Sequence, residues 1–378
     1  MAQGAYIGVN GVARKITGGY IGVNGKARKL IKAYIGVGGV ARPCWSADRL
    51  SYYGTIESLS VARSRLAATS VGNHALFGGG YDGSTYAVVN TYDANLVKGM
   101  TALGYTRRNL SATNIGNHAL FGGGFDGISS AIDVIAFDES LTKSEPTRLS
   151  AARYDLAATS ISNYAIFAGG FNGSFNCANV DAYDHSLTKI VPQDLGMPRY
   201  NLAATHVGEY ALFGCGQTNT TLTNRLDVYD SSLTRSSPFA LGDIFHSLAA
   251  ASVGDYAIFA GGTGVLSSSG QTLYTSNTMS INKSLTYSSD PTQLVDAATN
   301  LAATTVGDYA IFAGGHAGLS RPKAKTTAFD KSLTRTIPTA LSAARYDLAA
   351  AAVGKYAIFA GGQTAENTYS DVSDVYAA

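Results

Sequence analysis

The chain is poor in cysteine, tryptophan, proline and charge. Its 378 residues include three cysteines, one tryptophan and eight prolines, and 14% of them are charged. Cys44, Cys177 and Cys215 are odd in number and far apart, so the sequence supports neither a disulfide framework nor a thiolate metal site. The six histidines are scattered or repeat with the rest of the pattern. We therefore expect no metal and no cofactor.

Long apolar runs are also absent. No stretch approaches the roughly 20 apolar residues that a membrane-spanning helix needs. The N-terminus lacks the basic-then-apolar order of a signal peptide. The sequence predicts neither membrane insertion nor standard secretion.

Glycine and charge asymmetry are the features that stand out. Hydrophobic residues make up 46% of the chain and 43 residues are glycine, which is typical of a turn-rich all-β protein. Residues 1–45 hold seven basic residues and no acidic one, whereas the rest holds 21 basic and 26 acidic residues. The basic residues of the first segment recur at fixed positions, so we interpret them as a solvated hairpin face and expect no nucleic acid partner.

Three near-copies of one phrase open the chain. The first reads YIGVNGVAR, and the copies run from Tyr6 to Arg14, Tyr20 to Arg28 and Tyr34 to Arg42. An Asn-Gly pair between short runs rich in Val and Ile predicts a β-hairpin, and in the third copy this pair is Gly-Gly. Isolated hairpins are marginally stable, so we expect this module, residues 1–45, to self-associate or to dock on a larger body.

A second phrase recurs seven times in the remainder, residues 46–378. Examples are RSRLAATSVGNHALFGGG from Arg63 and RYDLAATSISNYAIFAGG from Arg153. Its central leucines follow one another at steps of 44, 46, 46, 46, 53 and 47 residues, a period that belongs to propeller blades. These leucines are Leu66, Leu110, Leu156, Leu202, Leu248, Leu301 and Leu348.

Each repeat predicts four short strands, which together form one blade. The small residues of LAATSV suit a crowded central axis, YAIFAGG is apolar because sheets cover both its faces, and two outer strands follow. The seventh repeat ends after its third strand. The segment LSYYGTIES, residues 50–58, aligns with the missing outer strand, so we predict that it completes the last blade and closes the ring.

These repeats resemble the Kelch family of β-propellers. The resemblance rests on Gly-Gly doublets such as Gly169-Gly170, on the arginine before the first strand, on the aromatic residue of the third strand, and on LGMPR at residues 195–199. The tryptophan usual late in a Kelch repeat is absent. The resulting prediction is an all-β fold: a seven-bladed Kelch-like β-propeller closed by an N-terminal strand and preceded by the hairpin module.

Candidate ligand-binding residues come first from the repeated arginine. Turns from strand two to three and from strand four to one share one propeller face, so five arginines could form a positive ring at the mouth of the channel. The alternative is that each arginine satisfies carbonyl or carboxylate groups within its own blade. The five are Arg63, Arg107, Arg153, Arg199 and Arg345.

The symmetry breaks in blades five and six, which gives further candidates. Phe245 and Ala298 replace the arginine there, and both blades have divergent loops, at residues 263–277 and 316–325. Long loops on a rigid scaffold are where recognition commonly occurs, although drift in a tolerant loop would give the same pattern. The candidates in this sector are Phe245, Tyr274, Arg321 and Lys323.

We expect no catalytic residues and no enzyme activity. A copper radical site would need clustered His and Tyr ligands with a cross-linkable cysteine, and a sialidase-like site would need an acid and nucleophile set. The sequence contains neither arrangement.

The hairpin module also resembles segments of virion-associated proteins from phages of Gram-positive hosts. The resemblance implies a virion protein of the tail or baseplate, assembled in the host cytoplasm, that displays the propeller to a host surface glycan or protein. Contacts with other virion proteins would involve Tyr6, Arg14, Tyr20, Arg28, Tyr34 and Arg42. The alternatives are a head fibre or capsid decoration protein, an intracellular Kelch interaction scaffold, and a glycan-processing enzyme.

Overall fold

The computed structural model describes residues 50–378 except 243, 266–270, 289–291 and 319–320 and the side chain of Val265. Of residues 1–49 it describes only the backbone of six strands. The described residues contain no helix, and hence none long and apolar enough to cross a membrane. The chain divides into two compact units, one within Met1–Ser51 and one spanning Tyr52–Ala377.

The N-terminal unit consists of three two-stranded antiparallel hairpins, as the repeated phrase predicts. Val9 pairs with Val12, Val23 with Lys26 and Val37 with Val40. The predicted Asn-Gly and Gly-Gly turns lie outside the described residues. The strands are β1 (Tyr6–Val9), β2 (Val12–Lys15), β3 (Gly19–Val23), β4 (Lys26–Leu30), β5 (Lys32–Val37) and β6 (Val40–Ser46).

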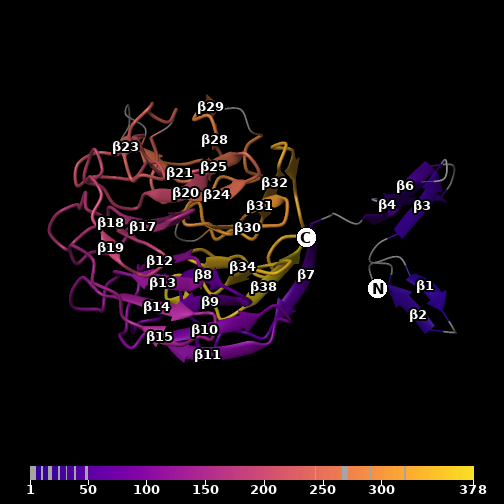
Figure 1. Ribbon diagram of the computed structural model, residues 1–378, viewed down its shortest axis with the longest axis horizontal. Helices are drawn as coiled ribbons and strands as arrows, with labels where there is room; N and C mark the ends of the chain where they lie inside the picture. The colour runs from indigo at the N-terminus through magenta and orange to yellow at the C-terminus, as the bar shows by residue number, and fades with distance from the viewer. Residues whose placement is uncertain are drawn as a thin grey trace. The chain divides into compact units, whose positions relative to one another are not determined.

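The larger unit is a seven-bladed β-propeller, which confirms the predicted fold class. Each blade is a four-stranded antiparallel sheet. First strands gather near the centre and outer strands lie at the periphery (Figure 1). The innermost strands are β8 (Ala67–Val71), β12 (Ser111–Ile115), β16 (Ala157–Ile161), β20 (Ala203–Val207), β24 (Ala249–Val253), β30 (Ala302–Val306) and β34 (Ala349–Val353).

The second and third strands of each blade form its buried middle. The second strands are β9 (His74–Gly78), β13 (His118–Gly122), β17 (Tyr164–Ala168), β21 (Tyr210–Gly214), β25 (Tyr256–Ala260), β31 (Tyr309–Ala313) and β35 (Tyr356–Ala360). The third strands are β10 (Val88–Asp93), β14 (Val134–Asp138), β18 (Val180–Tyr183), β22 (Leu226–Tyr229), β28 (Thr278–Asn282), β32 (Thr326–Asp330) and β38 (Ser373–Ala377).

The outer strands are short in five blades and long in two. They are β11 (Lys98–Ala102), β15 (Lys143–Ser144), β19 (Lys189–Ile190), β23 (Arg235–Ser236), β29 (Tyr287–Ser288), β33 (Arg335–Thr336) and β7 (Ser51–Ile56). The last of these, β7, pairs with β38 in blade seven. The strand predicted to close the ring therefore does so.

Small residues allow the blades to pack around the axis. Along β16 the burial alternates, with Ala157, Thr159 and Ile161 buried and the other two residues partly buried. At the end of β9, a Cβ on Gly78 would lie 2.8 Å from the ring of Phe121 in the next blade. Such contacts hold one blade against the next without voids.

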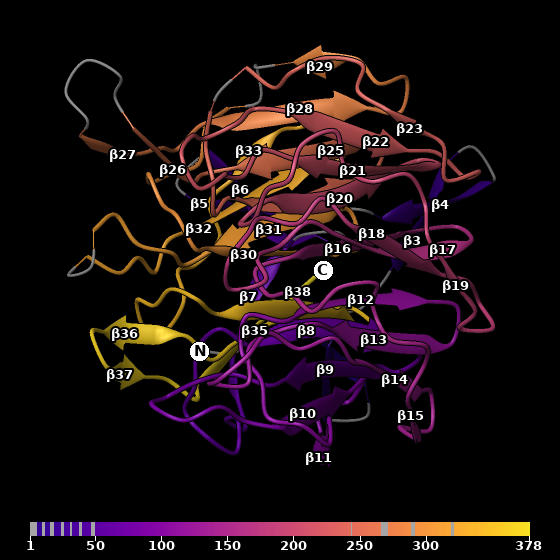
Figure 2. The same cartoon turned by 90° about the vertical axis from the view of Figure 1, so that its left-hand side faces the viewer.

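Two blades carry an additional hairpin in the loop between their second and third strands. Blade five has β26 (Thr263–Val265) and β27 (Thr272–Tyr274), and blade seven has β36 (Gln363–Ala365) and β37 (Thr368–Tyr369). Both hairpins project from the same side of the propeller (Figure 2). This side is the face on which the sequence predicts the mouth of the channel.

Candidate functional site

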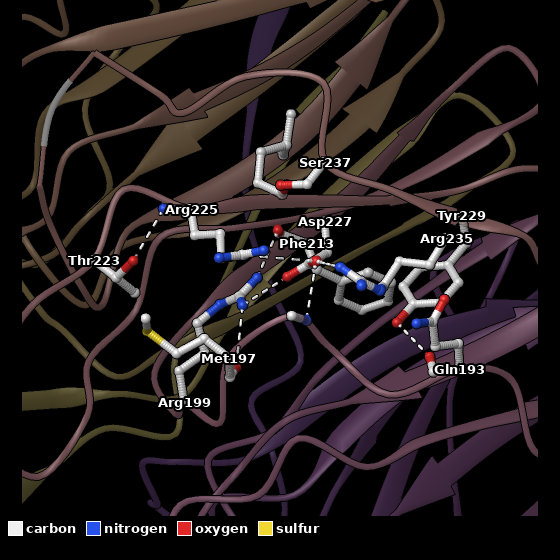
Figure 3. Close-up of polar contacts among 12 residues, drawn as sticks. Gln193, Met197, Arg199, Phe213, Thr223, Arg225, Asp227, Tyr229, Arg235 and Ser237 are labelled. Carbon is white, nitrogen blue, oxygen red and sulfur yellow. Dashed lines mark hydrogen bonds and ion pairs between the residues drawn. The ribbon is translucent and has the colours of Figure 1, made fainter.

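The five repeated arginines lie inside their blades rather than at the channel mouth. The side chain of each has a relative exposure of 0%. The Arg199 guanidinium donates hydrogen bonds to Asp227 at 2.7 Å and to the carbonyl oxygen of Phe213 at 3.0 Å (Figure 3). The same contacts recur for Arg153 with Asp181 and Phe167, and for Arg345 with Asp374 and Phe359.

The other two arginines are buried with weaker partners. Arg63 meets the neutral side chain of Asn90 at 3.0 Å, and burial lowers the pKa of Arg63 to about 10. Arg107 donates to carbonyl oxygens and lies 3.8 Å from the nearest carboxylate oxygen of Asp133. Burial lowers the pKa of Arg107 as well. A buried guanidinium loses its hydration, and without a close carboxylate no opposite charge stabilises its charged form.

Blades five and six lack both the arginine and its acidic partner. Phe245 replaces the arginine in blade five, where Met279 stands opposite Phe259 at the position that aspartate takes in blades three, four and seven. In blade six the corresponding pair is Ala298 and Thr327. The arginines thus follow the alternative interpretation, since each satisfies groups of its own blade. The prediction that these side chains form a positive ring at the mouth of the channel is therefore wrong.

The residues two positions after the five arginines, and after Phe245 and Ala298 in blades five and six, surround the channel instead. Each has a positive φ between 52° and 56°. The N–H of each donates to the carbonyl oxygen of its counterpart in the adjacent blade at 2.9–3.0 Å, and the seven bonds close a circle. We call this set the axial ring: Arg65, Asn109, Asp155, Asn201, Ser247, Asn300 and Asp347.

Side chains of the axial ring bond to one another. The Asn109 amide donates to Asp155 at 2.5 Å, and the Asn300 amide donates to Asp347. Arg65 forms an ion pair with Asp347 at 3.4 Å. Burial raises the pKa of Asp155 to about 6, and the nearby charge of Asp347 adds to this, although Asn109 and Arg65 oppose it.

Aromatic side chains stand above the axial ring. Phe125 and Tyr154 have ring centroids 5.3 Å apart, Tyr154 and Phe171 5.7 Å, and Phe171 and Tyr200 5.4 Å. On another sector His316 lies 4.6 Å from Tyr346. We call this set the aromatic wall: Tyr81, Phe125, Tyr154, Phe171, Tyr200, Tyr274, His316, Tyr346 and Tyr369.

The axial ring and part of the aromatic wall enclose a cavity of about 400 Å³. A deeper cavity of about 230 Å³ continues below it to the seven leucines that precede the first strands. We call the upper cavity the funnel. It is lined by Arg65, Arg108, Asn109, Phe125, Tyr154, Asp155, Asn201, Ser247, Asn300 and Asp347.

The structure does not gather the candidates of blades five and six into one site. Phe245 is buried, with its ring 2.8 Å from where a Cβ on Gly264 would lie. Arg321 is exposed, and Lys323 lies 3.9 Å from Asp296. Tyr274 belongs to the aromatic wall, with its ring centroid 5.9 Å from that of His316, but it does not line the funnel.

The side chains of the candidate anchoring residues lie outside the described part of the chain. Cys177 and Cys215 are buried, and neither forms a disulfide bond with a residue that the structure describes. Among the described residues, no group of three His, Cys, Asp or Glu side chains is arranged to hold a metal ion.

The loop that carries each predicted arginine also carries residues that line the funnel. In RYDL at residues 153–156, the arginine is structural, whereas Tyr154 and Asp155 line the funnel. The signal for these residues is variation within a fixed phrase. The position before the repeated leucine is always polar but changes among Arg, Asn, Asp and Ser, while the leucine that follows it is the same in all seven repeats.

Comparison with known proteins supports the fold. No protein-family model matches the chain, and no curated protein sequence matches it. Among solved structures, it is similar to the one described as "Structure of YjhT", with a TM-score of 0.59 and 13% sequence identity over 75% of this chain and 99% of that chain. At this identity the likeness shows the propeller fold alone.

Proposed function

We propose that this chain is a phage virion structural protein of the tail or baseplate, built from Kelch-like repeats, whose propeller binds a carbohydrate of the host surface. The funnel is the observation that carries the binding half of this proposal. The virion half rests on the N-terminal sequence, in which basic hairpin repeats precede a rigid domain. Residues 1–45 contact other virion proteins, and the propeller is the displayed part.

The chemistry of the funnel suits a sugar. Its walls offer aromatic faces, which pack against the C–H groups of a pyranose, and its base offers amide, hydroxyl and carboxylate groups that bond to sugar hydroxyls. A volume of about 400 Å³ falls within the range of small-ligand sites, roughly 300–1,000 Å³. A protein partner would instead bury about 800 Å² of surface, so the funnel by itself matches a carbohydrate better.

The test is binding of the full-length protein to purified host envelope glycans, on an array and by calorimetry. Tyr154→Leu removes one aromatic face of the funnel and is expected to weaken binding at least tenfold, or about 1.4 kcal/mol. Phe175→Ser removes an exposed aromatic ring outside the funnel and serves as the matched control. Equal affinity of the two variants, or no glycan binding by the wild-type protein, would contradict the proposal.

The position on the particle is tested separately. Antibody labelling of intact particles should mark the tail or baseplate. Labelling of the head would instead identify a head fibre or decoration protein, and absence from particles would favour an intracellular Kelch scaffold.

One observation favours a second candidate, a glycan-processing enzyme. Asp155 has a pKa raised to about 6, and it shares the axial ring with Asp347. A carboxylic acid that keeps its proton near neutral pH can donate it to a substrate. Release of fragments from a bound glycan, abolished by Asp155→Asn, would identify this activity. The binding proposal expects the glycan to be recovered intact.

A further inference from the structure

Two cations line the funnel, and they differ in their partners. The guanidinium of Arg65 is occupied by its ion pair with Asp347 at 3.4 Å. Arg108, in contrast, forms no ion pair or side-chain hydrogen bond with any residue that the structure describes. Arg108 is therefore the funnel cation whose charge is not already satisfied.

Aromatic contacts hold Arg108 in place. Its guanidinium carbon lies 4.1 Å from the ring centroid of Tyr81 and 5.3 Å from that of Phe125. Tyr81 belongs to blade one and Phe125 to blade two, so the side chain is fixed between two blades. Stacking occupies the faces of a guanidinium but leaves its N–H edge free, and that edge matches two oxygens of a carboxylate or phosphate.

The two carboxylates of the funnel do not compete strongly for this edge. Asp347 is held by Asn300 and Arg65, and Asp155 by Asn109. The charge of Arg108 acts on Asp155 and lowers its pKa, but no ion pair forms between them. The N–H edge of Arg108 thus remains available to a ligand that enters the funnel.

We propose that the funnel selects an acidic glycan, and that Arg108 binds the anionic group of this glycan in a bidentate manner. This inference rests on the proposed carbohydrate function. The sugar ring lies against Phe125 and Tyr154, and the polar atoms of the axial ring bind its hydroxyls. Two sources supply the same chemistry: the carboxylate of a uronic acid and the phosphate of a polyol-phosphate polymer.

The experiment compares matched acidic and neutral probes with the full-length protein. Calorimetry or ligand-observed NMR measures glucuronate against glucose, and glycerol phosphate against glycerol. We expect at least one acidic probe to bind tenfold or more tightly than its neutral partner, and the pair that shows this preference identifies the source. Arg108→Gln should abolish the preference, and Arg108→Lys should retain part of it.

Lys355→Gln removes a cation from the turn between β34 and β35 and is the control. It should leave the preference unchanged. Equal binding of acidic and neutral probes, or a preference that survives Arg108→Gln, would overturn this inference while leaving the carbohydrate function standing. Failure of every probe and of every host glycan to bind would overturn both.

Discussion

At the scale of single residues, aspartate has two different roles in this propeller. Asp181 lies fully buried opposite Phe167 and compensates Arg153 at 2.8 Å. Asp155 faces the channel and bonds to an amide. The first role needs an ion pair because an unpaired buried charge is strongly unfavourable. The second leaves the carboxylate at the wall of the funnel, where the proposed ligand would meet it.

The buried pair of blade three predicts a non-additive pair of substitutions. Arg153→Met leaves Asp181 without its fully buried partner and should lower the free energy of unfolding by about 3 kcal/mol. Adding Asp181→Met should recover much of this loss, since blade five already has Met279 at the equivalent position. Urea denaturation of both single variants and the double variant measures the coupling. Additive losses would show that the two side chains act independently.

Asp155 predicts a pH dependence of stability. Its pKa in the folded protein is about 6, above the ordinary value of 3.8, so the folded state binds the proton more tightly than the unfolded chain. The tighter binding of the proton stabilises the folded state, and this stabilisation is present in full below pH 4 and is lost as the pH rises through 6. The free energy of unfolding relative to Asp155→Asn should therefore fall by about 2 kcal/mol between pH 4 and pH 7.

Asparagine is the suitable comparison because it tolerates the φ of +52° at this position. Denaturation curves of the two proteins at matched pH values give the difference. A flat difference across this range would mean that Asp155 ionises normally in the folded protein.

At the scale of elements, a Gly-Gly doublet joins one blade to the next in six of the seven blades, and in blade four Cys215 takes the place of the first glycine with a φ of +60°. The N–H of Gly170 donates to the carbonyl oxygen of Arg199 at 2.9 Å, and a Cβ on Gly169 would lie 2.7 Å from that oxygen. The first glycine therefore permits both a positive φ and a close backbone approach. The doublet stabilises the seam rather than a ligand site.

The doublet predicts a contrast between two glycine substitutions. Gly169→Ala combines a φ of +68° with a clash against backbone, whereas Gly354→Ala has a φ of +55° and its nearest contact at 3.7 Å. Both should destabilise the protein, by about 1 kcal/mol for Gly354→Ala and by about 3 kcal/mol for Gly169→Ala. Urea midpoints measure both, and equal losses would show that the close approach at the seam has no effect of its own.

The elements were predictable from the sequence because the repeat is local and regular. Spacing of 44 to 53 residues, small residues in the first strand and a truncated last repeat are enough to derive blades and their closure. The axial ring was not predictable, because its conformation is set by bonds between blades. Arg65 and Ser247 adopt the same positive φ as Asn109 and Asp155, although only Asn and Asp favour it.

At the scale of the whole molecule, one strand makes the ring continuous. β7 comes from the N-terminal side of the propeller and pairs with β38 near the C-terminus (Figure 1). Within blade seven, Tyr52 of β7 donates to Asp374 of β38 at 2.5 Å. The backbone N–H of Gly362 donates to the carbonyl oxygen of Arg63, which joins blade seven to blade one. The first and last blades therefore meet as any two neighbouring blades do.

Because β7 closes the ring, we expect the outer strand of blade seven to contribute more to the stability of the propeller than the outer strand of any other blade. Two prolines in β7, Tyr53→Pro with Gly54→Pro, remove N–H donors and cannot adopt the φ of +124° at Gly54. The matched control places two prolines in β15, Lys143→Pro with Ser144→Pro, at the same position of blade two. The free energy of unfolding should fall by about 3 kcal/mol more in the β7 variant than in the control, because the β7 variant opens the ring and exposes the edge of β38.

Urea denaturation followed by circular dichroism measures this difference, and size-exclusion chromatography reports association through the exposed edge. The reason is topological. In blade two the flanking blades remain covalently continuous when the outer strand is lost, whereas in blade seven the outer strand is itself the link between the two ends of the propeller. Equal losses from the two variants would mean that the seven blades hold together without this link.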